Sequence, residues 1–170
     1  NRAQIRVGES VGVFGGGPAG QILHQLASVA GAGKVSLFTH SEEKLKLARQ
    51  LGATEALNPD DVNMEGLEFD LVFDAVGAAT VVEDSLRCLA RRGRLIVFGQ
   101  APEGEHARVD LFNLLMKEVS IIPSFLNPFT ASQAIRLLKE RKIDVESLVS
   151  HNIPLDDVQQ AFDLHTQKVP

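Results

Sequence analysis

Residues 10–20 read SVGVFGGGPAG. The first five form an apolar run of strand length, which predicts a β-strand buried on both faces. After the glycines, Ile22, Leu23 and Leu26 recur at helical spacing and predict a helix over 19–30. A buried strand that turns through glycines directly into a helix indicates an α/β fold with a parallel sheet.

The same alternation continues along the chain, with predicted strands over 10–14, 35–39, 55–57, 69–74, 94–98 and 119–122. The predicted helices cover 19–30, 41–51, 80–91, 111–117, 130–141 and 156–165, with a final extended segment over 149–153. In the helix over 130–141, the residues expected to face inward are Ala134, Ile135, Leu137 and Leu138. We therefore expect a single domain over 1–170, an α/β Rossmann fold with a doubly wound, six-stranded parallel sheet in the order 3-2-1-4-5-6.

The composition limits the class of protein. The chain has 170 residues, a formal net charge of −5 and 44% hydrophobic residues, which fits one folded domain and excludes intrinsic disorder. The mild acidity argues against a nucleic-acid or anionic-membrane partner, because phosphate binding needs clustered Lys and Arg. The basic cluster over 87–94 falls at a predicted helix end, where cations suit the helix dipole, so we interpret it as structural.

The sequence also bears on compartment and redox state. Its apolar runs are too short to span a membrane, and the polar residues 1–9 do not resemble a signal peptide, so we expect a cytoplasmic protein. Cys88 is the only cysteine, which excludes an intramolecular disulfide, and its neighbours predict a core position.

The glycines of residues 15–20 fit the pattern G-x-G-x-x-G between a predicted strand and a predicted helix, the context that gives the pattern its meaning. Gly15 would make the tight turn, Gly17 would let the backbone approach a pyrophosphate, and Gly20 would let the helix pack on the strand. Pro18 fits the first helical turn because it needs no N–H there, and the remaining N–H groups would hold the anion. The motif predicts a dinucleotide site.

The end of the second predicted strand bears on which dinucleotide is bound. An acid there would accept hydrogen bonds from the adenosine ribose and indicate NAD, but the position holds Thr39. Thr39, His40 and Lys44 offer hydroxyl, imidazole and ammonium groups, and without a carboxylate a 2′-phosphate is not repelled. We therefore favour NADP. The alternative is that the Thr39 hydroxyl contacts the ribose of NAD.

The ends of the later strands are expected to line the same crevice. Asp74-Ala75-Val76-Gly77 ends the fourth strand, and Phe98-Gly99-Gln100 ends the fifth. Their small residues suit close approach of a ribose or nicotinamide. For Asp74 itself we favour a structural role, in which it caps or braces the following turn.

Several further segments follow in an order that resembles a known family: SEEKL at 41–45, QLGAT at 50–54, FDAVG at 73–77, GRLIVFG at 93–99 and PLDDVQQAF at 154–162. Together with the glycine motif, they resemble the cofactor-binding domain of the medium-chain dehydrogenase/reductase family. The resemblance is closer to the zinc-dependent alcohol and polyol dehydrogenase branch, and it covers nearly the whole chain.

The resemblance implies that the parent enzyme transfers hydride between an alcohol or polyol and a nicotinamide cofactor. It places the pyrophosphate on Gly15, Gly17, Pro18, Ala19 and Gly20, and the adenosine ribose near Thr39, His40 and Lys44. It places the nicotinamide side at Ala75, Val76, Gly77, Gly99 and Gln100, and it matches Ser124 and Phe125 to the end of the sixth strand. Pro123 departs from the family, which has glycine there.

Members of this family carry a separate catalytic domain, which supplies the zinc ligands and most of the substrate pocket. The candidate ligands in this chain show no ligand spacing: Cys88, His24, His40, His106, His151 and His165. We therefore expect neither a metal site nor catalytic residues here, with zinc in the parent protein only, and we expect the chain to be inactive alone.

Two alternative functions remain open at this point. One is the cofactor domain of a zinc-free quinone or enoyl reductase, and the other is a non-catalytic nucleotide sensor. The resemblance also implies a homodimer, since the sixth strand often pairs across a dimer in the family. In this chain residues 119–122 would form an apolar edge strand, which favours such pairing.

Overall fold

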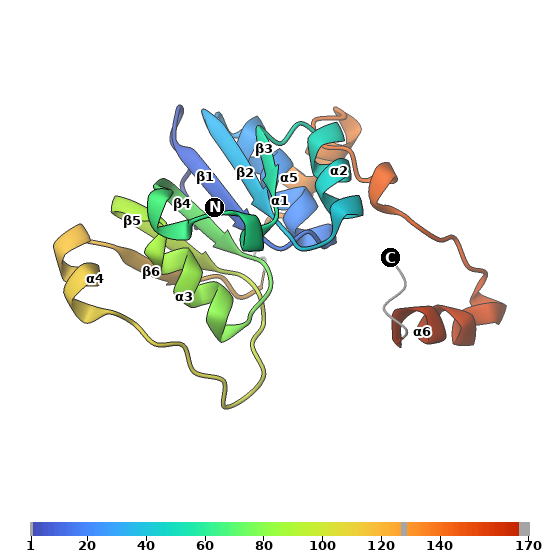
Figure 1. The fold of residues 1–170 in the computed structure, drawn as a ribbon. Helices are drawn as coiled ribbons and strands as arrows, with labels where there is room; N and C mark the ends of the chain where they lie inside the picture. Colours follow the sequence, from blue (N-terminus) through green and yellow to red (C-terminus); the bar gives the residue numbers. More distant parts are fainter. Residues whose placement is uncertain (1, 127–128, 167–170) are drawn as a thin grey trace.

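The computed structural model describes residues 2–126 and 129–166. Its centre is a six-stranded sheet in the order β3-β2-β1-β4-β5-β6, in which every pairing is parallel (Figure 1). The strands are β1 (Ser10–Phe14), β2 (Lys34–Phe38), β3 (Glu55–Leu57), β4 (Phe69–Asp74), β5 (Leu89–Val97) and β6 (Ser120–Pro123). This topology confirms the predicted fold class and strand order.

Helices connect the strands and continue beyond the last one. They are α1 (Pro18–Val29), α2 (Glu42–Gln50), α3 (Ala79–Arg87), α4 (Leu111–Lys117), α5 (Ala131–Lys139) and α6 (Val158–Thr166). Single 3₁₀ turns are η1 (Pro59–Asp61), η2 (Met64–Gly66), η3 (Glu146–Leu148) and η4 (Leu155–Asp157). None of the helices in the described part of the chain combines the length and apolar character needed to cross a membrane.

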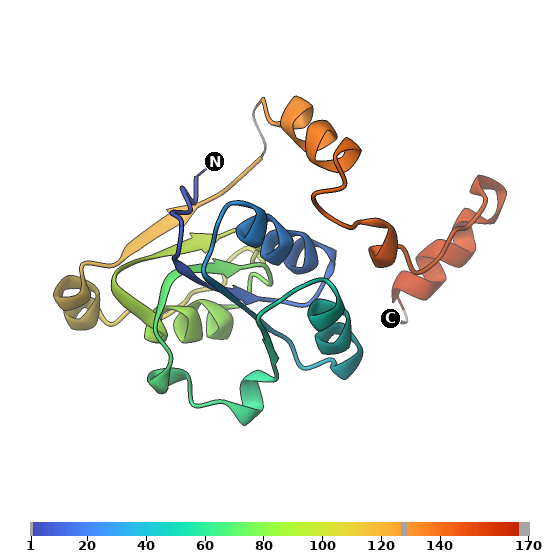
Figure 2. The same cartoon turned by 90° about the horizontal axis from the view of Figure 1, so that it is seen from above.

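The two faces of the sheet bury separate apolar clusters, because neighbouring residues of a strand point to opposite sides. From β4, Leu71 and Phe73 pack in a cluster with Leu23 and Ala27 of α1. Val72, between them, packs in the other cluster with Val81, Val82 and Leu86 of α3. Helices α1 and α3 accordingly lie on opposite faces (Figure 2).

The amino ends of the central strands are joined by charged groups. Arg94 donates two hydrogen bonds to Glu9, at 2.9 and 2.8 Å, and the two side chains are only 15% and 11% exposed. The hydrogen bonds from Arg94 hold the pKa of Glu9 below its usual value. Asp70 accepts from the backbone N–H and hydroxyl of Ser10, at 2.8 and 2.7 Å. These contacts connect β1, β4 and β5 near their amino ends, at the end of the sheet opposite the glycine motif.

The basic cluster over 87–94 is structural, although the helix-end explanation covers only part of it. Arg87, in the last turn of α3, pairs with Asp84 at 2.8 Å. Arg92 and Arg94 instead belong to β5, and Arg92 pairs with Glu118 at 2.7 Å. Arg87 and Arg92 thus take part in ion pairs within the domain, while the absence of a nucleic-acid partner stays a prediction.

The predicted helix over 80–91 is wrong at its C-terminal end. Helix α3 stops at Arg87, and Leu89 already pairs with Phe69 of β4. A register shift follows in this ladder between Phe69 and Leu71, so the first residues of β5 pair irregularly. Sequence periodicity near 89–91 suits a helix, but pairing with a neighbouring strand determines the conformation. The expected extended segment over 149–153 forms no strand.

The inward face expected for 130–141 is also wrong. In α5, Ala134, Ile135 and Leu138 are exposed, and Leu137 is half-buried. After this helix, the side-chain amide of Gln25 on α1 bonds both backbone groups of Asp144, at 2.7 and 2.9 Å. The last helix, α6, stands away from the sheet (Figures 1 and 2). The sheet therefore does not cover the apolar side chains of α5.

Candidate cofactor-binding site

The turn between β1 and α1 requires glycine at two positions. Gly15 has a φ of +115°, in the region that favours glycine, and its N–H donates to the carbonyl of Phe38 at 2.9 Å. A Cβ on Gly20 would collide with the carbonyl oxygen of Gly15. The first glycine therefore makes the turn and the last permits close packing of helix and strand, as the motif predicts.

Gly17 lies at the point where a ligand would approach. It is the N-cap of α1, with a φ of −69°, and no side chain caps the helix. A Cβ built on Gly17 would meet no atom within 4 Å, so the protein itself leaves this space open. Pro18 occupies the first helical position. An open, uncapped helix N-terminus provides N–H donors for an anion, and the turn fits a pyrophosphate.

A residue that the motif does not reveal, Gln21, anchors this turn. Its side chain is buried in α1, and its Nε2 donates to the carbonyl of Lys44 at 3.0 Å. Its Oε1 lies 3.1 Å from Nε2 of His24, which is also buried. Gln21 therefore connects the glycine turn to the start of α2. A polar residue at a buried helix position is the sequence signal that would have found it.

The end of β2 packs against the same turn. A Cβ on Gly16 would lie 2.7 Å from the Thr39 hydroxyl oxygen, so Thr39 abuts the turn directly. The N–H of Thr39 donates to Leu57 at 3.1 Å, which holds the end of β2 beside β3. The Ser41 hydroxyl accepts a hydrogen bond from the N–H of Lys44 at 3.4 Å and caps α2. Thr39 and the glycine turn therefore form one surface.

His40 is the exposed residue next to Thr39, and the structure places a carboxylate beside it. Nδ1 of His40 lies 3.1 Å from Oδ2 of Asp60 in η1. Along the chain, no acid follows Thr39 before Glu42, and Asp60 is twenty positions away from His40. Only the adjacency of β2 and β3 brings Asp60 to this place.

Asp74, at the end of β4, has the structural role that we favour from the sequence. Its Oδ1 accepts hydrogen bonds from the N–H groups of Val76 and Gly77, at 2.9 and 3.0 Å. Its carbonyl accepts from Phe98 and Gly99 after β5, at 3.0 and 2.8 Å. The side chain is fully buried. Asp74 thus ties together the turns that follow β4 and β5.

The small residues of these two turns allow their backbones to touch. Gly77 has a φ of +84°, and a Cβ on it would lie 2.5 Å from the carbonyl carbon of Gln100. A Cβ on Gly99 would collide with the backbone nitrogen of Gly77. On the other side, Val76 approaches Gly15: a Cβ built on Gly15 would lie 3.1 Å from Cγ2 of Val76. The turn after β4 therefore stands between the glycine motif and the end of β5.

The end of β6 completes this edge of the sheet. Pro123 pairs with Val97, and the N–H of Ser124 donates to the Val97 carbonyl at 2.9 Å. Proline is compatible with an edge strand, so its departure from the family does not break the pairing. Ser124 is half-buried and Phe125 is 79% exposed. Most of the predicted cofactor residues thus lie at the carboxyl ends of the strands or in the turns that follow them. Pro18, Ala19, Gly20 and Lys44 lie in the first turns of α1 and α2. The contacts of all these residues with a cofactor stay predictions.

The candidate metal ligands do not gather. Within residues 2–126 and 129–166, no three His, Cys, Asp or Glu side chains come together as a metal site. Burial raises the pKa of the Cys88 thiol to about 12 and lowers the pKa of His24 to about 4, so both stay neutral near pH 7. The side chain of His165 lies outside the described residues.

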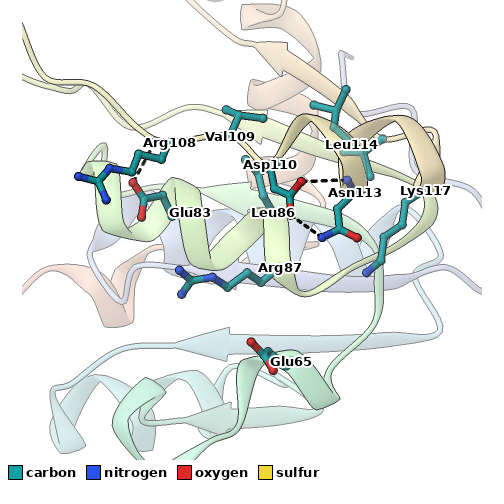
Figure 3. A pocket seen from close by; sticks show the side chains of 11 residues that line it. Glu65, Glu83, Leu86, Arg87, Arg108, Val109, Asp110, Asn113, Leu114 and Lys117 are labelled. Atoms are coloured by element: carbon teal, nitrogen blue, oxygen red, sulfur yellow. Dashed lines mark hydrogen bonds between the residues drawn. The ribbon is translucent and has the colours of Figure 1, made fainter.

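A groove of about 640 Å³ lies elsewhere, between α3 and α4 (Figure 3). Its charged lining residues are Glu65, Glu83, Arg87, Arg108, Asp110 and Lys117. Several of these already serve the fold: Asp110 caps α4 at the Asn113 N–H (3.1 Å), and Lys117 donates to the carbonyl of Leu89 at 2.7 Å. The mixed charges and these internal bonds do not single out a ligand.

Comparison with known proteins agrees with this geometry. A family model described as zinc-binding dehydrogenase matches residues 18–140. The chain belongs to the zinc-binding dehydrogenase family. This match confirms the resemblance seen in the motifs. The matched region contains most of the predicted cofactor residues described above.

Relatives within the family show how much of a whole protein the chain represents. It is 30% identical over 177 residues to S-(hydroxymethyl)glutathione dehydrogenase of Synechocystis sp., covering 96% of this chain and 48% of that protein. The chain therefore spans about half the length of the curated relatives it matches.

Solved structures give the same proportion. A protein of Sinorhizobium meliloti, described as a zinc-binding dehydrogenase bound to NADP, is 30% identical with a TM-score of 0.84, over 87% of this chain and 46% of that one. An alcohol dehydrogenase zinc-binding domain protein of Burkholderia ambifaria is 25% identical with a TM-score of 0.92, over 99% and 48%. Members of the family thus share the fold that forms this edge.

Proposed function

We propose that this chain is the dinucleotide-binding half of a zinc-dependent alcohol or polyol dehydrogenase, and that it binds NADP in preference to NAD. The observation that carries the proposal is the glycine turn, with Gly17 open to solvent at the uncapped start of α1. Thr39 in place of an acid at the end of β2 supports NADP, as does the relative described as bound to NADP.

We assign each set of residues at the carboxyl ends of the strands a part in binding the dinucleotide. The glycine turn and the start of α1 hold the pyrophosphate, while Thr39, His40 and Lys44 surround the adenosine ribose. The turns tied by Asp74 border the nicotinamide, with Ser124 and Phe125 at the far end. The nicotinamide supplies the hydride chemistry, so the residues of this chain bind and orient the cofactor.

The rest of the proposed enzyme lies outside this chain. A catalytic half supplies the zinc ligands and substrate pocket, so the chain alone is inactive, and metal analysis of the longer protein distinguishes this proposal from a zinc-free reductase. We also propose a cytoplasmic location and a homodimer formed through β6, whose Ile121 is exposed. A monomeric mass in solution at micromolar concentration would contradict the dimer.

The first test is a pair of titrations with NADPH and NADH, followed by the fluorescence of the nucleotides. The chain has no Trp or Tyr, so the protein background is low. Binding of NADPH about tenfold tighter than NADH, equivalent to about 1.4 kcal/mol, is the expected result. Tighter binding of NADH would contradict the NADP preference, and binding of neither would contradict the nucleotide site.

A substitution at Gly17 connects any binding to the proposed turn. Gly17→Asp places a carboxylate in the open space, and its φ of −69° suits any residue, so the fold is expected to survive. Repulsion of the pyrophosphate should weaken both nucleotides by at least about tenfold. The matched control is Gly66→Asp in η2, where a Cβ also has room. Equal effects of the two variants would show that binding occurs elsewhere.

A further inference from the structure

The His40–Asp60 pair lies where the adenosine ribose of a bound dinucleotide is proposed. His40 directly follows Thr39, which abuts the glycine turn, and Asp60 reaches His40 from the turn after β3. The separation between His40 Nδ1 and Asp60 Oδ2 is 3.1 Å. The carboxylate that the sequence lacks at the end of β2 is therefore supplied by another segment.

The position of Asp60 is set by its backbone. Asn58 is the N-cap of η1, and its Oδ1 accepts a hydrogen bond from the Asp60 N–H at 3.1 Å. Pro59 restricts the backbone at the first position of this turn. Because the Thr39 N–H also bonds Leu57, η1 stays close to the end of β2. The backbone of Asp60 is thus held close to the end of β2 by contacts that do not involve the charge of its side chain.

Both partners of the pair face solvent. The side chains of His40 and Asp60 are 70% and 74% exposed, so a ligand can reach either of them. The nearest acid along the sequence, Glu42, instead pairs with Arg49, at 3.4 Å. Asp61 has the same charge as its neighbour, but Asp60 is the one bonded to His40. Asp60 is therefore the acid that lies beside His40 at the proposed ribose site.

We propose that Asp60 is a specificity-determining residue that limits the preference of this site for NADP. The Asp60 carboxylate accepts hydrogen bonds from the ribose hydroxyls of NAD and repels the 2′-phosphate of NADP. It also pairs with the His40 imidazole, which is then less available to the phosphate. Thr39 and Lys44 favour the phosphate, and Asp60 opposes them. This inference rests on the proposed dinucleotide site.

The substitution Asp60→Asn tests the proposal because it removes the charge and keeps the shape. The ratio of NADH to NADPH dissociation constants should rise by about tenfold, through tighter NADPH binding and unchanged or weaker NADH binding. Asp61→Asn is the matched control, since it removes the same charge one residue away. It should change the ratio by less than about threefold. Thermal unfolding of both variants checks that the fold is intact.

Each outcome separates the two proposals. If Asp60→Asn leaves the ratio unchanged, or shifts it no more than Asp61→Asn does, Asp60 does not discriminate between the cofactors and the inference is overturned. If neither the unmodified chain nor either variant binds a nucleotide, the proposed function itself fails. If the ratio shifts only in Asp60→Asn, both proposals are supported.

Discussion

Leu71 of β4 and Leu155 of η4 are the same residue type in one chain, yet Leu71 has no exposed surface and Leu155 keeps 85% of its own. The difference extends to the regions around them. Strands β1, β2, β4 and β5 bury apolar side chains in two clusters with α1 and α3, and Leu37 of β2 belongs to a third cluster with Leu45 and Ala48 of α2. After β6, the exposed large apolar residues are Phe125, Leu126, Phe129, Ile135, Leu138, Val149, Leu155, Val158 and Phe162.

The comparison shows what an apolar pattern specifies. Both regions have amphipathic helices, so both predict an apolar face that needs a covering surface. For α1 and α3 that surface is the sheet, which the same chain supplies. For α5 and α6, the described residues do not supply one, and the chain spans about half the length of its curated relatives. A pattern predicts that a face becomes buried, but it does not identify the partner.

The largest expected effect comes from opening the core of the first region. Leu71→Ala removes a fully buried side chain from the central strand β4, and should cost about 3–5 kcal/mol of unfolding free energy. Leu155→Ala, the control from the second region, should cost less than about 0.5 kcal/mol. Urea denaturation of both variants measures this. Equal losses would show that the two regions are packed alike.

A smaller effect on folding stability is expected from His24, which is buried in the packed first region. Its pKa falls from 6.5 in the unfolded chain to about 4 in the fold because burial disfavours the charged imidazole. Between these values the unfolded chain binds a proton that the folded chain does not. Folding stability should therefore fall by about 2–3 kcal/mol as the pH is lowered from 7 to 4, on top of other titrations.

The variant His24→Gln keeps a polar side chain there but cannot titrate. Its stability should fall less between pH 7 and 4 than that of the unmodified chain. The control is His151→Gln, because His151 is exposed in the second region. That substitution should leave the pH profile unchanged. Denaturant unfolding at several pH values compares the three proteins, and a His24→Gln profile parallel to the unmodified one would contradict the burial of a neutral imidazole.

The sequence predicts some parts of the site better than others, for a physical reason. Gly15 and Gly20 follow from local rules, since a left-handed turn and a close helix approach each require glycine. Strand order follows from crossover rules. The positions of Gln21 and Asp60 depend instead on contacts between segments twenty or more residues apart, 3.0 Å to Lys44 and 3.1 Å to His40. Such contacts leave no local periodicity.

The start of β5 shows the same limit. The sequence predicts residues 89–91 as the end of a helix, but in the structure they begin β5, where Leu89 pairs with Phe69 of β4. For α5 the sequence predicts the helix correctly, but the predicted burial of its apolar side is wrong. Its pattern is amphipathic, yet nothing in the sequence shows that the sheet would leave Ile135 and Leu138 exposed. Propensity and pattern are local, whereas burial is decided by the whole molecule.

The smallest expected effect on stability comes from α5. The double variant Ile135→Gln, Leu138→Gln replaces the two large apolar side chains that α5 exposes with a residue of similar helix propensity. In this chain the unfolding free energy should change by less than about 0.5 kcal/mol, because these side chains are not packed. Fluorescence of a dye that binds exposed apolar surface should fall at the same time. A loss of more than about 1 kcal/mol would show that α5 packs on the domain, and the contrast between the two regions would then disappear.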